Sequence, residues 1–477
     1  MITGLYENLK QNRFISAIRT MMNSKWMLIV LVFLAGISNI FALEIPVYYT
    51  YLFFIILAVL FCEDLLCLLP IATVGYMTFA KENNPMAKEA TSSFLNASTI
   101  IHLIIIASAI AVLILSRITY DLIKHKERRK LPKLLFGFVA LGIAYILGGL
   151  LSPYYSFKTI FFGLVQIIAL SFSYLIFYYT IDWKKVNKNY YAFLFTTIGF
   201  LMVVEILNML IEADFFNTNG EFYRSSIYTG WGINNNVVSV CMFIIPAPLY
   251  YTLTRNNGWR FIPISTLFLL FTILTQSRNG MLMGTILYCL SAIVVLIKTS
   301  GKEKLKNFIT YLLILLVAIL GFMIFKDTIK NLFASIYKVG TSDSGRFDIY
   351  IEGIKQYLDY PIWGNGFYAC KAFRWGINEE GLFLPGRYHN TYVQILASCG
   401  TVGLIAYLYH RYQTIKLCLK SNNPGATIIT LTLIGFILIG LLDCHFHNFG
   451  PGLLYSGVLV LLENVYCYKE KESPNNI

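Results

Sequence analysis

A polar cluster, Arg387-x-His389-Asn390, comes directly before an apolar segment near the C-terminal end of the sequence. An unperturbed imidazole titrates near ~6.5 and is substantially neutral at ambient pH, so His389 is a candidate general base. Asn390 can orient a hydroxyl or the imidazole, and Arg387 can assist in binding an anion. From the residue alone, His389 is also explained as a polar residue at the start of a membrane helix.

Two further arginines suit anion binding, because planar guanidinium groups meet phosphate oxygens bidentately. Arg278 stands in "TQSRNGMLMG", a short turn before a helix that we expect to begin near Gly280. The positive end of the helix dipole disfavours an arginine there, and a bound anion would relieve this. Contact with lipid headgroups is an equally simple explanation for Arg278. Arg346 opens "RFDIYIEGIKQYL", whose apolar residues have the spacing of an amphipathic helix on the membrane surface.

Asparagines and histidines supply the remaining candidates. "GINNNVVS" places Asn234 and Asn236 at the start of an apolar segment. Helix capping explains one asparagine of this run, and the others are expected to bind a polar ligand. "DCHFHN" pairs two histidines with an aspartate, but a metal site normally takes three or four such ligands. We therefore predict no metal ligands.

The composition requires that membrane helices position these residues. Hydrophobic residues make up 57% of the 477 positions and charged residues only 13%, which is typical of an integral membrane protein. Apolar runs recur along the chain without the alternation expected of strands, so we predict an all-α polytopic fold with about 14 spans, in the range 12–14. The predicted spans are 26–43, 46–61, 65–80, 99–116, 134–151, 159–181, 191–211, 233–254, 261–276, 280–297, 308–325, 390–410, 425–443 and 450–467.

The distribution of positive charge orients these spans. With the N-terminus inside, most Lys and Arg residues fall on the inner side, and most of the outer ones lie in one long loop. The basic segment "RITYDLIKHKERRKLPK" is then a cytoplasmic anchor and not a nucleic-acid patch. We expect a cytoplasmic segment at 1–25, eleven spans within 26–325, an extracytoplasmic loop at 326–388, three spans within 389–467 and a cytoplasmic tail at 468–477.

The loop 326–388 is predicted to be folded. It is long for a connection in a compact protein and rich in aromatic residues. Its apolar residues at helical spacing are followed by Pro361 and "WGNG", which predict the end of the helix and a turn. Its positive and negative charges nearly cancel, so any selectivity for anions must come from individually placed arginines.

Three stretches in this order resemble the O-antigen ligase and polymerase family of lipid-linked glycan transferases. They are the Ser277–Gly280 turn, the segment from Gly345 through "DYPIWGNGF", and the His389–Leu396 run leading to Gly400-x-x-Gly403. The Asn-rich "NNNVVS" also fits, and the resemblance covers roughly residues 230–410.

The resemblance implies a GT-C-like glycosyltransferase in the bacterial cytoplasmic membrane, with its active site on the extracytoplasmic side. The donor would be a glycan on undecaprenyl pyrophosphate, and the partners would be a glycan or lipid-linked acceptor, the bilayer and other envelope assembly proteins. No metal or other cofactor is implied. His389 would be the general base, Arg278 and Arg346 would bind pyrophosphate, and Asn390, Arg387, Asn236 and Asn234 would bind substrate.

Three functions remain open at this point. A polymerase for O-antigen or capsule polysaccharide is preferred over a ligase that delivers finished glycan to lipid A-core, because no acceptor signature favours the ligase. A transporter would place charged residues along a path through several spans, whereas here they gather on the outer side. A scaffold for envelope assembly would not explain why arginine and histidine candidates converge at one depth.

Overall fold

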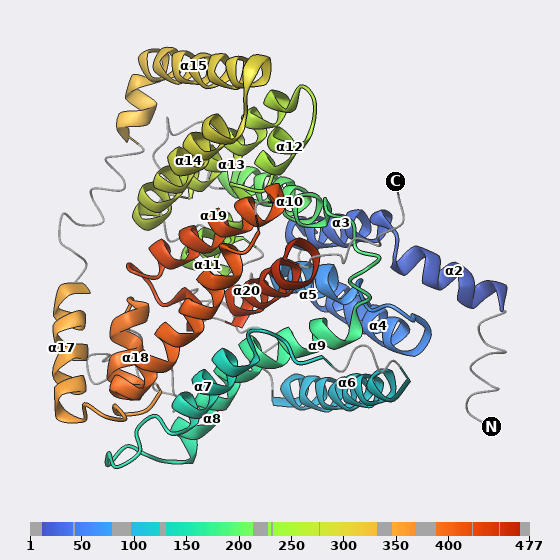
Figure 1. Cartoon of the computed structure of the whole chain (residues 1–477), viewed down its shortest axis with the longest axis vertical. Helices are drawn as coiled ribbons and strands as arrows, with labels where there is room; N and C mark the ends of the chain where they lie inside the picture. The colour runs from blue at the N-terminus through green and yellow to red at the C-terminus, as the bar shows by residue number, and fades with distance from the viewer. Residues whose placement is uncertain are drawn as a thin grey trace.

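The computed structural model is a bundle of helices (Figure 1). It describes residues 12–41, 43–78, 97–124, 130–212, 228–229, 232–275, 277–331, 346–367, 388–421, 423–447 and 449–467. The α-helices are α2 (Arg13–Met22), α3 (Lys25–Phe41), α4 (Glu44–Phe61), α5 (Leu68–Thr78), α6 (Ala97–Lys124), α7 (Leu135–Ile146), α8 (Phe157–Ile167), α9 (Ser173–Thr180), α10 (Tyr190–Glu212), α11 (Asn234–Ile244), α12 (Leu249–Thr254), α13 (Ile262–Leu274), α14 (Arg278–Lys298), α15 (Gly301–Ile324), α17 (Arg346–Asp359), α18 (Thr391–Cys418), α19 (Pro424–Ile439) and α20 (Phe449–Leu461).

Shorter elements complete the description. Two short π-helices, η3 (Ile168–Phe172) and η7 (Leu462–Tyr466), continue α8 and α20. Two short 3₁₀-helices are η5 (Gly258–Phe261) and η6 (His445–His447). The strands β1 (Tyr228–Thr229) and β2 (Gly232–Ile233) pair antiparallel just before α11. This small pair was not predicted, because strands of two residues are too short to show alternation.

Four helices within the described residues are long and apolar enough to cross a membrane, namely α10, α14, α15 and α18. A fifth arises if α2 and α3, which are bent by 69° at their junction, are counted as one span. The predicted span 99–116 lies within the long helix α6, and the other predicted spans correspond to shorter apolar helices or to consecutive pairs such as α11 with α12. The all-helical membrane fold is therefore supported, while the number of about 14 spans stays a prediction.

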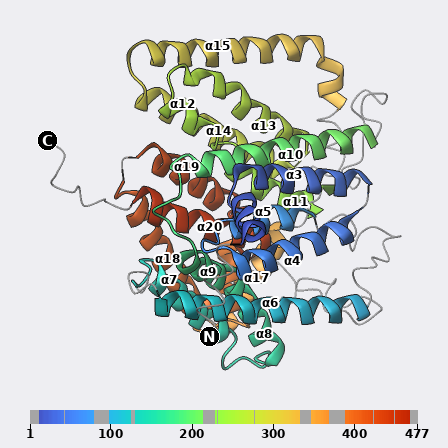
Figure 2. The same cartoon turned by 90° about the vertical axis from the view of Figure 1, so that its right-hand side faces the viewer.

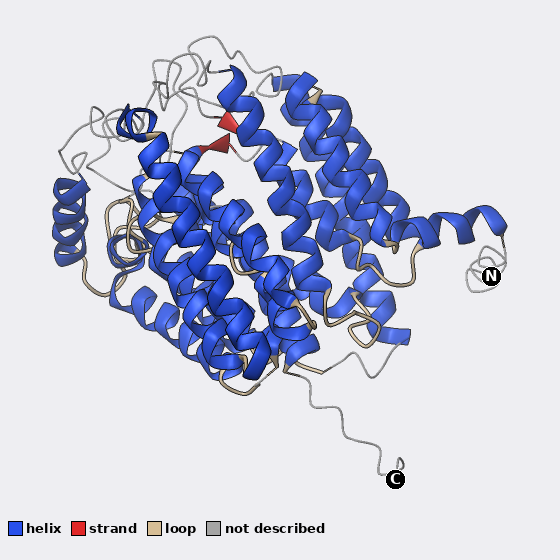
Figure 3. Cartoon of the chain, turned by 90° about the horizontal axis from the view of Figure 1, so that it is seen from above, coloured by secondary structure: helices blue, strands red, loops and turns tan. Residues whose placement is uncertain are grey.

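Several long helices share a common direction but differ in what surrounds them. In Figure 2 α15, α10, α3 and α6 lie nearly parallel, and Figure 3 shows the bundle from above. Residues 450–461 of α20 are all buried, as expected for a central helix that is apolar on every side. By contrast, α15 buries only Asn307 and Thr310, although it contains an apolar stretch long enough to cross a membrane. An apolar helix with most of its surface exposed is typical of a helix that contacts lipid.

Two helices extend beyond the spans predicted for them. The span predicted at 99–116 lies within α6, which continues to Lys124, and the one predicted at 308–325 corresponds to α15, which begins at Gly301. In both cases charged residues on the inner side of the predicted topology extend the helix beyond its apolar run. Hydropathy marks the part of a helix that lies in hydrocarbon, whereas hydrogen bonding continues through favourable polar residues.

Helix α18 is broken, although Tyr392 to Leu404 was predicted to be ordinary span. Gly400 has φ 62° and ψ −158°, a conformation outside the helical region. The turn at 361–367, which contains "WGNG", supplies hydrogen-bond partners for backbone groups on both sides of the break. The N–H groups of Asn365 and Gly366 donate to the carbonyls of Ala397 and Ser398, both at 2.8 Å. On the other side of the break, the N–H groups of Thr401 and Val402 donate to the carbonyls of Pro361 and Ile362, at 2.8 and 3.2 Å.

This exchange pins the turn after α17 to the middle of α18. A Cβ added at Gly400 would lie 2.3 Å from the Ile362 carbonyl oxygen, and one at Gly364 would lie 2.5 Å from the Ser398 carbonyl carbon. The two backbones can approach so closely only because both positions are glycine. The pinned turn fixes the end of α17 relative to the start of α18.

We expect Gly400→Ala to destabilise the protein. The added methyl group meets backbone, and the conformation is one that only glycine adopts readily, so the cost is at least about 1–3 kcal/mol. Gly321→Ala in α15 is the matched control, because a Cβ there meets nothing within 4 Å and alanine favours a helix. Thermal unfolding in detergent should show a clear loss for the first variant and little change for the second. An unchanged midpoint for Gly400→Ala would contradict the described break.

Candidate functional site

The start of α18 is held by a side-chain cap. Asn390 Oδ1 accepts hydrogen bonds from the N–H groups of Tyr392 and Val393, at 2.9 and 3.1 Å. Its Nδ2 donates to the Leu441 carbonyl at 2.9 Å. Asn390 therefore caps α18 and ties it to the segment after α19. Its predicted contact with substrate stays a prediction, and its described bonds position its neighbour His389.

Four successive carbonyls, of residues 440–443, join α18, α19 and α17. The Thr391 N–H donates to Gly440 at 2.8 Å, and Thr391 Oγ1 donates to Asp443 at 3.1 Å. Arg346 Nη1 donates to the Leu442 carbonyl at 2.7 Å. Asn390 Nδ2 donates to the remaining carbonyl, that of Leu441. Carbonyls beyond a helix end need such partners, and a cation is favoured at that negative end of the dipole.

His389 is paired with Asp443. Its Nδ1 lies 3.2 Å from Asp443 Oδ1, and its backbone carbonyl accepts a hydrogen bond from the Tyr350 hydroxyl at 2.9 Å. The backbone of His389 has φ 50°, a conformation uncommon for a residue other than glycine. With Nδ1 directed at the carboxylate, the Nε2 atom is the one available for proton transfer. The His389 side chain is 25% exposed and Asp443 only 5%, so a substrate can reach the histidine.

Arg346 brings a positive charge to the same place. It is the first residue of α17, and it donates a hydrogen bond to the carbonyl of Leu442, the residue that precedes Asp443. Tyr350, one turn later on α17, bonds His389. The Leu442 bond uses one of the five N–H donors of the guanidinium group. Arg346, His389 and Asp443 thus form a cluster at one end of the bundle, which we call the His389 cluster.

Asp443 is nearly buried, and the His389 ring and the Cys444 N–H face its carboxyl group. The Cys444 N–H lies 2.7 Å from Asp443 Oδ1. A carboxylate beside Nδ1 keeps the N–H on that atom and stabilises the imidazolium that forms when Nε2 takes a proton.

The other predicted site residues lie elsewhere or are not described. Arg278 is the first residue of α14, exposed and preceded by Ser277, whose hydroxyl accepts from the Gly280 N–H at 3.2 Å. The helix thus begins two residues earlier than predicted. The described contacts do not join Arg278 to the His389 cluster. Asn234 and Asn236 lie in the first turn of α11, and their side chains, like the whole of Arg387, are outside the described residues.

The His-x-His pair is divided between two partners. His445 Nε2 lies 3.9 Å from Asp443 Oδ2, whereas His447 Nε2 lies 3.0 Å from the Tyr145 hydroxyl. Both histidines are buried in η6. Among the residues that the structure describes, no group of three or more His, Cys, Asp or Glu side chains has the arrangement of a metal site.

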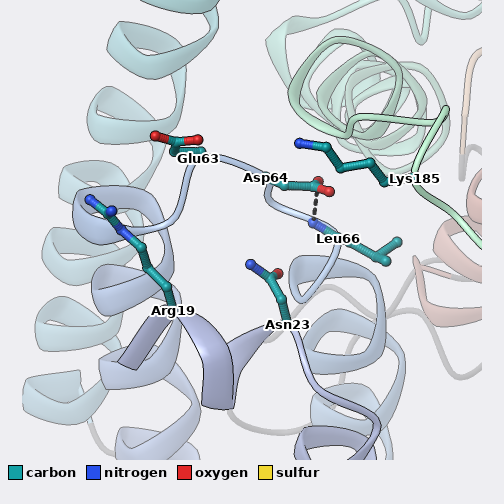
Figure 4. Close-up of a pocket in the computed structure, with 6 residues that line it drawn as sticks. All are labelled: Arg19, Asn23, Glu63, Asp64, Leu66 and Lys185. Carbon is teal, nitrogen blue, oxygen red and sulfur yellow. Dashed lines mark hydrogen bonds between the residues drawn. The ribbon is translucent and has the colours of Figure 1, made fainter. Parts of the chain in front are cut away.

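A surface pocket lies away from all predicted site residues (Figure 4). It is lined by side chains of both charges, and Asp64 Oδ1 accepts a hydrogen bond from the Leu66 N–H at 3.1 Å. Its loops lie on the inner side of the predicted topology. The lining residues are Arg19, Asn23, Glu63, Asp64, Leu66 and Lys185.

Sequence reasoning missed the pairing of Asp443 with His389. The two residues are 54 positions apart, and Asp443 was considered only as a metal ligand with its neighbouring histidines. The available signal was that both stand at the predicted outer end of apolar segments. Tyr350 was recognised only as an apolar position of the α17 pattern, although its hydroxyl contacts the His389 backbone.

Part of the chain is similar to a known protein family. Residues 263–408 match the family described as O-antigen ligase. The match begins in α13 and ends within α18, so it includes Arg278, Arg346 and His389 but not Asp443. No curated protein matches the chain.

Proposed function

We propose that the chain, whose residues 263–408 match the family described as O-antigen ligase, is a surface polysaccharide polymerase of that family. In this proposal it transfers a glycan from undecaprenyl pyrophosphate to a sugar hydroxyl of the next lipid-linked unit. The observation that carries the proposal is the His389 cluster. In it, His389 lies beside the Asp443 carboxylate, and Arg346 donates to the carbonyl of the preceding residue, Leu442.

His389 activates the acceptor. Its Nε2 atom removes the proton from the acceptor hydroxyl while the hydroxyl oxygen forms a bond to the anomeric carbon of the donor. The imidazolium that forms is stabilised by the Asp443 carboxylate at Nδ1, 3.2 Å away. The buried Asp443 carboxylate also fixes the orientation of the His389 imidazole ring. The carboxylate is itself held by the Cys444 N–H, and hydrogen bonds from α17 and α18 fix the backbone of residues 440–443.

Arginine side chains stabilise the leaving group. As the bond from the anomeric carbon to the pyrophosphate oxygen breaks, its electron pair stays on the pyrophosphate, whose charge increases. Arg346 belongs to the His389 cluster and can exchange its contact with the Leu442 carbonyl for phosphate oxygens. Arg278, which is exposed at the start of α14, is assigned to the same pyrophosphate in this proposal, where the helix N-terminus adds to its effect.

We propose that this chemistry takes place outside the cytoplasm. We retain the cytoplasmic segments 1–25 and 468–477, the spans within 26–325 and 389–467, and the extracytoplasmic loop 326–388 as parts of the proposal. The support is the distribution of Lys and Arg. A lipid-anchored donor then reaches the His389 cluster from the bilayer, and the acceptor sugar reaches it from water.

A ligase is the second candidate, because the matched family is described as O-antigen ligase. Purified protein supplied with one lipid-linked repeat unit distinguishes the two. A ladder of longer lipid-linked glycans supports the polymerase. Product that appears only after addition of a lipid A-core acceptor identifies a ligase, and transbilayer movement without any product would contradict both.

A further inference from the structure

Helix α17 has three distinct faces. One face, including Tyr350, Gly353 and Gln356, packs against α18 or is buried. A second face carries charge, and a third is apolar and exposed. The charged residues are Asp348, Glu352, Lys355 and Asp359, and the exposed apolar residues are Phe347, Ile351, Ile354 and Leu358.

The exposed apolar residues form one continuous stripe. Their spacing of four, three and four residues puts them on one side of a helix. Phe347, Ile351 and Leu358 are 65%, 53% and 66% exposed, so the part of the chain that the structure describes leaves much of their surface open. Over eleven residues at about 1.5 Å each, the stripe is about 16 Å long. A water-exposed stripe of this length would be unusual in a helix with a charged face available for water.

The direction of α17 suits a membrane surface. In Figure 1 its axis runs across those of α15 and α6, which lie along the bundle. A helix that runs across the direction of the spans is suitably oriented to lie along a membrane surface. In that position one face can meet the protein, one can meet water and one can meet hydrocarbon.

We propose that the stripe of α17, Phe347, Ile351, Ile354 and Leu358, is immersed in the hydrocarbon of the outer leaflet, so that the bilayer holds α17 in place. Three acidic residues and one lysine on the charged face do not favour anionic headgroups. The apolar side chains, and not charge, are therefore what binds the membrane.

This inference rests on the proposed function for its consequence. Arg346 and Tyr350 belong to α17, and both contact the segments that carry His389 and Asp443. A helix anchored at the upper edge of the hydrocarbon keeps Arg346 at the depth of lipid phosphates. A lipid-linked pyrophosphate that diffuses in the same leaflet then meets the arginine without leaving the bilayer.

Site-specific photocrosslinking in nanodiscs tests the proposal without any measurement of glycan transfer. The photoreactive residue p-benzoylphenylalanine is placed singly at position 351 or 358, with positions 348 and 355 on the charged face as matched controls. After irradiation, mass spectrometry of the full-length chain identifies lipid adducts. We expect adducts at 351 and 358 at least several-fold above those at 348 and 355, in zwitterionic and in partly anionic nanodiscs alike.

Two other outcomes would overturn the proposal. Crosslinks between two chains at 351 and 358 would show that a second copy covers the stripe. Lipid adducts that are equal on both faces, or that depend on anionic lipid, would show that the apolar face is not specifically immersed. Because neither readout uses the donor, either result leaves the test of glycan transfer unaffected.

Discussion

Replacement of His389 by alanine is expected to reduce glycan transfer by about 10²–10⁴-fold, the usual contribution of a general base. The variant can no longer remove the proton from the acceptor hydroxyl. It also leaves the Asp443 carboxylate without the partner that lies 3.2 Å away. The measurement is the initial rate of formation of longer lipid-linked glycans by purified protein.

A second variant separates the loss of the base from the loss of folding. His389→Gln retains an amide N–H that can donate to Asp443, but a glutamine cannot take the proton. We expect His389→Gln to unfold at nearly the same temperature as the unsubstituted protein and to be as inactive as His389→Ala. Substantial turnover by either folded variant would contradict the assignment of the base.

Substitution of Arg346 is expected to have the second largest effect. Arg346→Ala should lower turnover by about 10²–10³-fold, the usual range for removing a group that stabilises transition-state charge. Arg346→Lys keeps the charge but not the planar fork, so we expect about tenfold or greater loss. The rate should fall with little change in donor binding, because the pyrophosphate gains charge only as the bond breaks.

The control for Arg346→Lys is the same change at an exposed arginine far from the site. Arg260 lies over the Trp259 ring on the inner side of the predicted topology and contacts no residue of the His389 cluster. Arg260→Lys should therefore leave turnover unchanged. Equal turnover of Arg346→Lys and the unsubstituted protein would argue that Arg346 serves only to hold the Leu442 carbonyl.

The candidate site residues could be predicted from the sequence more readily than the contacts between them. His389 and Asn390 could be found because they stand between a polar loop and an apolar run, and Arg346 because it opens an amphipathic pattern. Asp443 could not be assigned to His389, since only the packing of α18 against the end of α19 brings the two together. The relation of Arg278 to the cluster depends on the packing of α14, which no local pattern encodes.

The fold shows the same division. Apolar runs predicted the helices, because each run of about 20 residues must hydrogen-bond internally in lipid. They did not predict the break at Gly400, where backbone groups of α18 bond the turn at 361–367. The glycines at 364, 366 and 400 were visible, but a close approach between two segments some 35 residues apart leaves no periodic trace in either one.

The anomeric configuration of the newly formed glycosidic bond is the measurement that tests the proposed mechanism most directly. Direct displacement by a hydroxyl that His389 activates places the acceptor on the face opposite the pyrophosphate, so a single displacement inverts the anomeric carbon. NMR coupling constants of the donor and of the purified product give the two configurations. We predict opposite configurations, and retention of the donor configuration would contradict the account.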